Sequence, residues 1–202
     1  MSARLLEGKP IAEAIREQVK EQVAGLRAKG VTPRLVAVLA GDNPGAKFYA
    51  EAQEKACREV GIAYELQQHP ADITQQQLED AIRALNADPS VHGILLLMPV
   101  PKGLNGAAAQ ALIAPSKDVD GVSPANLGQV VLGQPRLAPC TAMSVIELLR
   151  ATGVDTYGKE AVVVGSSEIV GKPVALLLMD KYITRDAEGK TGRLAGATVT
   201  VC

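Results

Sequence analysis

The stretch RLVAVLAGDNPGAKFYAEAQEKACREVG, residues 34–61, decides the fold. Its first part, residues 34–40, is a short and nearly continuous apolar run, which predicts a strand covered on both faces. Asn43 then supplies a capping side chain and Pro44 needs no amide partner, so a helix is predicted to begin there. Gly61 ends this helix at a position that tolerates a left-handed backbone. A buried strand followed by a capped helix predicts an α/β fold.

Strands and helices continue to alternate on both sides of this stretch. The predicted elements are an amphipathic helix over residues 10–29, a strand over 62–68, a helix from a Thr74–Gln77 capping box to about Ala87, and an apolar strand over 91–98. Such alternation implies right-handed βαβ crossovers, so we expect a three-layer αβα domain with a mostly parallel sheet. His92 is expected to be a core histidine of the last strand.

The alternation breaks between Pro99 and Pro139, where six prolines separate short helical pieces. Ligand-binding loops of open parallel sheets follow the carboxyl ends of the strands, and this region begins at such an end. It contains KDVDG, residues 117–121. A turn is the simpler interpretation of this sequence, because a calcium loop needs a third acidic residue and a terminal glutamate at fixed positions.

A second α/β segment follows Pro139. The predicted elements are a helix from a Thr141 cap to Gly153, a strand over 161–164, a helix over 174–179, a surface loop over 180–196 and a strand over 197–202. We expect two domains, residues 1–139 and 140–202, of which the second is an incomplete Rossmann-type domain. Since only two predicted strands follow Pro139, we expect the chain to be a fragment or to lack an ordered C-terminal part.

The composition argues against several classes of protein. The 202 residues include 47% hydrophobic and 21% charged residues, as in a globular chain, and the net charge of −1 offers no attraction to nucleic acid or anionic membranes. The apolar runs are too short to span a bilayer. Three scattered cysteines form no disulfide framework, which favours a reducing cytoplasm, and two histidines make a histidine-based metal site improbable.

Two places have the chemistry of a ligand site. GSSEIVGKP, residues 165–173, joins a strand to a helix, so its glycines, serine donors and helix N-terminus suit a phosphate. It does not follow the generic dinucleotide pattern, and a plain strand-to-helix turn is an equal alternative. Tyr49 and Gln53 are one turn apart, beside an apolar stripe expected at Ala52, Ala56, Cys57 and Val60. They line a ligand cleft or, more simply, the rim of a surface helix.

The chain resembles the bifunctional methylenetetrahydrofolate dehydrogenase/methenyltetrahydrofolate cyclohydrolase family. The matching stretches span nearly the whole chain in the family's order: the tyrosine helix over residues 41–61, VHGILLLMPVP at 91–101, KDVDG at 117–121, PCT at 139–141 and VVVGSSEIVGKP at 162–173. The resemblance implies a folate-binding catalytic domain over residues 1–139, an NAD(P)-binding domain over 140–202, a homodimer, and a C-terminal helix beyond the chain given.

The resemblance also implies a reaction and its residues. Hydride leaves the methylene bridge of 5,10-methylenetetrahydrofolate for NADP or NAD, and water then opens the methenyl cation to 10-formyltetrahydrofolate. Tyr49 would stack on the folate, and Asp120 would hold the pterin and favour nearby positive charge. The remaining implied contacts are Leu97 and Pro99 to substrate, and Thr141, Gly165, Ser166, Ser167, Ile169, Gly171 and Pro173 to the cofactor.

Three positions depart from the family pattern. Gln53 replaces a lysine, Leu97 replaces a glutamine, and Ala46 replaces a frequent serine. The lysine assists the attack of water, and its amine exchanges protons whereas an amide does not. Hydride transfer depends mainly on the alignment of two bound rings. We therefore expect a dehydrogenase with weakened or lost cyclohydrolase activity.

Other hypotheses stay open at this point: a fully bifunctional enzyme, a non-catalytic folate- or nucleotide-binding module, and a different two-domain dehydrogenase for a small substrate. The choice between NAD and NADP depends on residues that follow the second strand of the cofactor domain, at or beyond Cys202.

Overall fold

A computed structural model describes residues 5–179, 183–185, 191–193 and 196–202 of the chain. The chain forms two compact units. The first unit is Glu13–Val119, and the second unit consists of Met1–Ala12 and Asp120–Cys202. Helix α1 (Gly8–Ala28) contributes residues to both units. Each unit has buried apolar clusters of its own.

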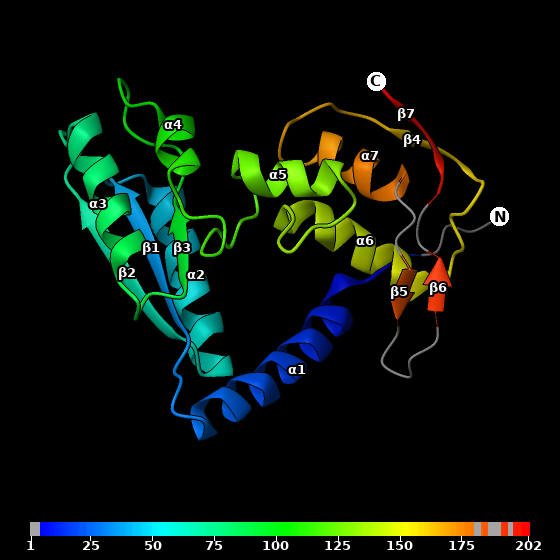
Figure 1. Ribbon diagram of the computed structural model, residues 1–202, viewed down its shortest axis with the longest axis horizontal. Helices are drawn as coiled ribbons and strands as arrows, with labels where there is room; N and C mark the ends of the chain where they lie inside the picture. The colour runs from blue at the N-terminus through cyan, green and yellow to red at the C-terminus, as the bar shows by residue number, and fades with distance from the viewer. Residues whose placement is uncertain (1–4, 180–182, 186–190, 194–195) are drawn as a thin grey trace. The chain divides into compact units, whose positions relative to one another are not determined.

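The first unit contains a three-stranded parallel sheet in the order β2-β1-β3 (Figure 1). The strands are β1 (Arg34–Ala40), β2 (Ala63–His69) and β3 (Gly93–Leu96). The central strand β1 is fully buried from Val36 to Ala40, as its continuous apolar sequence predicts. The predicted strand over 91–98 is shorter in the structure, and His92 is exposed, so its assignment to the core is wrong. Its Nδ1 accepts the Arg34 N–H at 3.2 Å.

Helices cover both faces of this sheet. Apolar residues of α3 (Gln75–Ala87) and α4 (Gly106–Ala111) pack on one face, against Val36, Val38, Ile94 and Leu96. Apolar residues of α2 (Pro44–Val60) pack on the opposite face, against Ala37, Leu39, Leu95 and Leu97. The alternation of side chains along each strand therefore divides the core into two layers.

The predicted helix signals of this unit are confirmed. Asn43 caps α2 by accepting the Ala46 N–H at 3.0 Å, and Gly61 ends α2 with a left-handed backbone, φ 84°. Thr74 and Gln77 form the expected capping box of α3. These caps satisfy backbone donors that a helix end leaves without partners.

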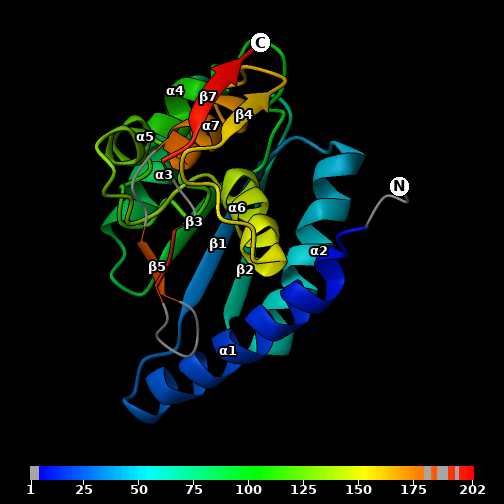
Figure 2. The ribbon, with the colours of Figure 1, turned by 90° about the vertical axis from the view of Figure 1, so that its right-hand side faces the viewer.

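The second unit contains two parallel strands, β4 (Glu160–Val163) and β7 (Thr198–Val201), which lie side by side next to α7 (Gly171–Met179) (Figure 2). Its other helices are α5 (Pro124–Val131) and α6 (Cys140–Thr152). One face of the strand pair packs on α6 and α7, whereas Val162 and Val164 on the other face are exposed.

Two predictions in this unit are wrong. Helix α6 begins at Cys140 with Pro139 as its N-cap residue and no side-chain cap, so Thr141 is not the cap. Pro139 suits this position because its carbonyl accepts the Met143 N–H at 2.9 Å and its own nitrogen has no hydrogen to satisfy. Within the predicted loop over 180–196, β5 (Ile183–Arg185) and β6 (Thr191–Arg193) form an antiparallel pair. The rest of that prediction, apart from Gly196, lies outside the described residues.

Candidate functional site

The turn after β4 depends on two glycines. Gly165 has φ +112°, a conformation that residues with side chains rarely adopt, and its N–H donates to the Cys202 carbonyl at 2.7 Å. A Cβ at Gly171 would lie 1.9 Å from the Gly165 carbonyl oxygen. Since no side chain fits there, the glycine at the start of α7 allows the turn to fold directly onto the helix N-terminus.

Ser167 connects this turn to α7. Its Oγ accepts the Gly171 N–H at 3.3 Å and its carbonyl accepts the Lys172 N–H at 3.0 Å. Glu168, whose charge opposes an anion, forms an exposed ion pair with Lys172 at 3.6 Å. This pairing offsets part of the repulsion between Glu168 and a bound phosphate.

The predicted cofactor residues differ in accessibility. Those of the turn itself, Gly165, Ser166, Ser167 and Ile169, are exposed, and so is Thr141 in the first turn of α6. Gly171 and Pro173 are buried, so they support the turn and offer little surface to a ligand. Their assignment as cofactor contacts stays a prediction.

A pocket of about 350 Å³ lies against the turn. Its lining includes Val145, Val162, Val174, Gly165, Ser167 and Gly171. Apolar walls with a few polar groups at one end are typical of a small-molecule site, and the N-terminus of α7 favours an anion at that end. The pocket and turn are therefore a candidate site for an anionic ligand, and the placement of cofactor phosphates next to residues 165–167 stays a prediction.

The second candidate site lies on α2 in the first unit. Tyr49 is 54% exposed, and Gln53 is partly buried one turn later. The helix face that packs on the sheet differs from the predicted stripe: Ala52 is exposed and Ala56 only partly buried, whereas Ala46, Ala50, Cys57 and Val60 are buried. This face contains Gln53 by helical spacing, so its side chain points toward the sheet layer.

Tyr64, at the start of β2, was not predicted from sequence. Its hydroxyl donates to Gln53 Oε1 at 3.4 Å. Burial, followed by the nearby Cys57, Glu54 and Tyr49, raises the pKa of Tyr64 to about 12, so the hydroxyl stays protonated near neutral pH. In the sequence, the turn at Gly61 could have indicated this contact. It reverses the direction of the chain, so the start of β2 lies beside the end of α2.

Two of the three departures from the family pattern belong to one apolar cluster. Ala46 and Leu97 are both buried in the layer between α2 and the sheet, and Tyr64 packs against the same cluster. Leu97 is only 3% exposed, so its side chain presents little surface to a substrate. Pro99 is exposed and follows a cis peptide bond with Met98. The two predicted substrate contacts stay predictions.

Asp120 begins the longer of the two stretches that make up the second unit, and it is partly buried. The next residue, Gly121, has φ +68°, and a Cβ there would lie 2.5 Å from the Ala138 carbonyl carbon. Only glycine allows the backbone at position 121 to lie this close to Ala138, which explains the glycine of KDVDG. Among the described residues, no group of three histidine, cysteine or acidic side chains is arranged to hold a metal ion.

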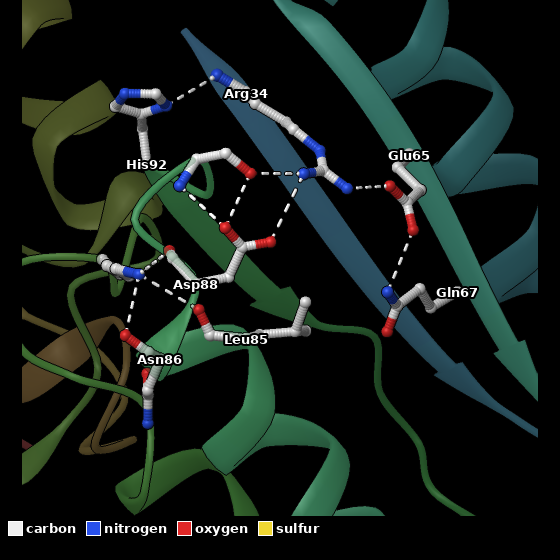
Figure 3. Close-up of polar contacts among 9 residues, drawn as sticks. Arg34, Glu65, Gln67, Leu85, Asn86, Asp88 and His92 are labelled. Carbon is white, nitrogen blue, oxygen red and sulfur yellow. Dashed lines mark hydrogen bonds and ion pairs between the residues drawn. The ribbon is translucent and has the colours of Figure 1, made fainter.

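Arg34 connects the amino-terminal ends of the sheet strands (Figure 3). Its guanidinium pairs with Glu65 of β2, donates to Ser90 Oγ at 2.7 Å and lies 3.5 Å from Asp88 Oδ2. The pKa of Glu65 is lowered, first by its hydrogen bond with Arg34 and then by Gln67. Arg34 and Glu65 alternate with Leu35 and Tyr64, which pack toward α2, so this network lies on the sheet face opposite the Gln53–Tyr64 contact and stabilises the fold there.

Parallel strands joined to helices, with a glycine turn at a helix N-terminus, place the chain in the broad class of α/β proteins with a candidate anion site at that turn. Comparisons with known sequences identify the family. Residues 6–120 match the tetrahydrofolate dehydrogenase/cyclohydrolase catalytic domain, and residues 139–202 match the NAD(P)-binding domain of the same proteins. The chain belongs to the tetrahydrofolate dehydrogenase/cyclohydrolase family.

Curated relatives and solved structures agree with this assignment. The bifunctional protein FolD of Bordetella bronchiseptica is 42% identical over the whole chain, which covers 66% of that relative. The FolD of Geotalea daltonii is 44% identical over 90% of the chain and 65% of that relative. The bifunctional FolD dehydrogenase/cyclohydrolase of Campylobacter jejuni has TM-score 0.90 and 39% identity, covering all of this chain and 67% of that one. The chain thus spans just under two thirds of the first relatives.

These comparisons confirm the predicted family and the mixed α/β fold with an NAD(P)-binding domain. The domain boundary after Pro139 stays a prediction, since residues 121–138 fall between the two matched regions. Within the ranges that the structure describes, no helix has both the length and the apolar character needed to cross a membrane.

Proposed function

We propose that the full-length protein is an NAD(P)-dependent methylenetetrahydrofolate dehydrogenase/methenyltetrahydrofolate cyclohydrolase. The main support is that the catalytic and the NAD(P)-binding regions of one family match the same chain in order. The two curated relatives are named bifunctional, and the name of the Campylobacter jejuni enzyme includes both activities. The whole reaction is a proposal because these relatives extend beyond the length of this chain.

The proposed roles follow the chemistry of each side chain. The dinucleotide accepts a hydride from the methylene bridge of the folate. The exposed ring of Tyr49 offers a flat surface for stacking, and the Asp120 carboxylate favours positive charge on the substrate. Gly165, Ser166 and Ser167 are proposed to donate to the cofactor phosphates. Further proposed contacts are Leu97 and Pro99 to folate, and Thr141, Ile169, Gly171 and Pro173 to the cofactor.

NADP is the proposed cofactor, with NAD as the alternative. A relative from Trypanosoma brucei, 35% identical with TM-score 0.84 over all of this chain and 65% of its own, has been solved in complex with NADP. A dehydrogenase from Saccharomyces cerevisiae described as NAD-dependent is 26% identical with TM-score 0.76, over 96% of this chain and 62% of that one. Comparing kcat/KM for NADP with that for NAD in the full-length protein decides between them.

A second candidate function is a dehydrogenase with weakened cyclohydrolase activity. Gln53 favours it, because an amide that accepts a hydrogen bond from Tyr64 cannot exchange protons with attacking water. Ala46 and Leu97, which are buried in the apolar cluster of the same layer, carry no polar group that could replace the lysine. The names of the relatives favour the fully bifunctional enzyme instead.

Two assays of the purified full-length protein test these proposals. Reduction of NADP or NAD in the presence of methylenetetrahydrofolate measures the dehydrogenase, and decay of methenyltetrahydrofolate measures the cyclohydrolase. No reduction of either dinucleotide would contradict the enzyme assignment. Folate binding by calorimetry without turnover would instead support a non-catalytic module.

The variant Gln53→Lys tests the second candidate. If the amide limits hydrolysis, the lysine should raise methenyltetrahydrofolate hydrolysis by about tenfold or more, a modest share of the gain that general acid–base catalysis provides. Hydride transfer should change by less than about twofold, because it depends on alignment. Wild-type hydrolysis well above the buffer rate, with no gain in the variant, would support the bifunctional enzyme. Lys55→Gln on the exposed part of α2 is the matched control.

The family resemblance also supports a homodimer, and the scattered free cysteines support a reducing cytoplasm. Light scattering during size-exclusion chromatography of the full-length protein tests the first proposal, with a mass of one chain as the contradicting result. Microscopy of a tagged protein in its source cells tests the second.

A further inference from the structure

The segment that leads to Asp120 is attached to the edge of β3. The Ile94 N–H donates to the Lys117 carbonyl at 2.7 Å, and Ile94 forms a parallel bridge with the buried Asp118. Val119 packs against Gly93, where an added Cβ would lie 2.6 Å from Val119 Cγ1. Residues 117–119 are therefore held by the sheet up to the residue that precedes Asp120.

The Lys117 side chain fixes the same segment to the end of α3. Its Nζ lies 3.0, 2.9 and 2.7 Å from the carbonyl oxygens of Leu85, Asn86 and Asp88 (Figure 3). The last carbonyls of a helix have no partner within the helix and form the negative end of its dipole. An ammonium group has three hydrogens, and three acceptors surround this one, so Lys117 serves the fold and not a ligand.

Asn86 makes the reciprocal connection from the helix to the loop. Its Nδ2 donates to the Leu112 carbonyl at 2.7 Å, and its Oδ1 accepts the Ala114 N–H at 2.9 Å. We call Asn86 and Lys117 the α3 clamp. Together their side chains make five hydrogen bonds between α3 with its following turn and residues 112–117.

We propose that Lys117 is a positioning residue for Asp120. The α3 clamp removes the freedom of the segment before Asp120, so that the carboxylate meets the folate in one orientation. The inference rests on the proposed function, in which Asp120 binds the substrate. It adds a role for a cation that touches neither folate nor dinucleotide.

The test uses Lys117→Met in the full-length protein, because methionine keeps the length of the side chain and removes its ammonium. A displaced carboxylate should raise KM for methylenetetrahydrofolate and lower kcat/KM by about 10- to 100-fold, the range that small misplacements of a reacting geometry produce. KM for NADP should stay within about twofold. Lys117→Arg keeps a cation that can donate to the same carbonyls and should restore most of kcat/KM.

Arg34→Met is the matched control. Arg34 also contacts the turn after α3, but through the side chains of Ser90 and Asp88 and not through the carbonyls that Lys117 binds. Both variants should lower the thermal midpoint, but only Lys117→Met should raise KM for the folate. A merely structural effect reduces the fraction of folded enzyme, which lowers kcat and leaves KM unchanged.

The outcomes separate the inference from the proposed function. If the wild-type protein reduces no dinucleotide with folate, the proposed function and this inference both fail. If the wild type turns over and folded Lys117→Met keeps its KM, or if Arg34→Met raises KM equally, only the inference fails. Should Lys117→Met not fold, Asn86→Ser breaks the α3 clamp from the helix side and is expected to raise KM for the folate in the same way.

Discussion

The variant Gly171→Ala, which adds a single methyl group, tests the turn after β4. In Gly171→Ala the new Cβ would overlap the Gly165 carbonyl oxygen, which is a backbone atom of a tight turn and cannot move independently. The turn must therefore open, which should cost about 1–3 kcal/mol of stability, as overpacking commonly does. Affinity for NADP should fall about tenfold or more, because the amide donors of residues 165–167 move with the turn. Calorimetric titration with NADP measures this effect.

Gly128→Ala is the control for that variant. Gly128 lies in α5 of the same unit, and an added Cβ would meet nothing within 4 Å. Alanine in a helix interior should raise stability by about 0.5–1 kcal/mol relative to glycine and leave NADP binding unchanged. Wild-type NADP affinity in Gly171→Ala would refute the proposed role of the turn.

At the residue scale, the helix caps could be predicted from the sequence, but the contact between a residue of α2 and one of β2 could not. Asn43, Gly61 and the Thr74 capping box act on backbone within a few residues, so their sequence patterns are sufficient. The contact of Gln53 with Tyr64 depends on the rotation of α2 on the sheet, which is set by the packing of Ala46 and Ala50. No pattern within one element determines that rotation.

At the scale of elements, the Arg34 network should make the sheet sensitive to acid. The folded-state pKa of Glu65 is lowered by Arg34, so its ionised form contributes stability above the unfolded pKa of about 4.3. That contribution is lost as the pH falls through the lower folded-state pKa. The difference in thermal midpoint between wild type and Glu65→Gln should therefore be largest near pH 7 and shrink as the pH falls below the unfolded pKa.

The pH series has a control on α2. Glu59→Gln removes an exposed carboxylate of that helix and should leave the dependence of the thermal midpoint on pH close to that of the wild type. A constant difference between wild type and Glu65→Gln from pH 3 to pH 7 would contradict the assignment of the Arg34 ion pair.

The bounds of elements were predictable where composition changes sharply and less so elsewhere. β1 ends at Ala40, directly before Gly41, and matches its apolar run. β3 is shorter than its run because Pro99 and the exposed His92 lie close to its two ends. Helix α6 begins earlier than its threonine suggested, since a proline can occupy the N-cap position without a side-chain bond. Polar sequence between residues 180 and 196 concealed the β5–β6 pair, because those strands lack an apolar pattern.

At the scale of the molecule, the two units have separate cores and should respond separately to ligand. We expect NADP at a concentration one hundred times Kd to raise the free energy of unfolding of the unit that contains Gly165 by about 2.7 kcal/mol. The thermal midpoint of that unit should rise accordingly. The transition of the first unit should move less. Differential scanning calorimetry of the full-length protein with and without NADP measures both, and equal shifts would contradict two separately responding units.

The family was predictable at this scale because its motifs occur in the same order along the chain, which the matches over residues 6–120 and 139–202 confirm. The set of active half-reactions was not predictable in the same way, because the proposed effect of Gln53 concerns a single side chain and only one of the two steps. The order of motifs along the chain indicates the family and the fold, whereas proton transfer depends on the chemical group of a single side chain.

The contact between Gly93 and Val119 has a consequence for the evolution of the chain. Valine is stiff at χ1, so Val119 cannot turn away from a methyl group introduced at position 93. A lineage can gain a side chain at one site only after the other has become smaller, which makes the order of the two mutations matter. Substitution histories at these positions should therefore be epistatic, with Gly93→Ala harmful alone and tolerated in the background of Val119→Ala.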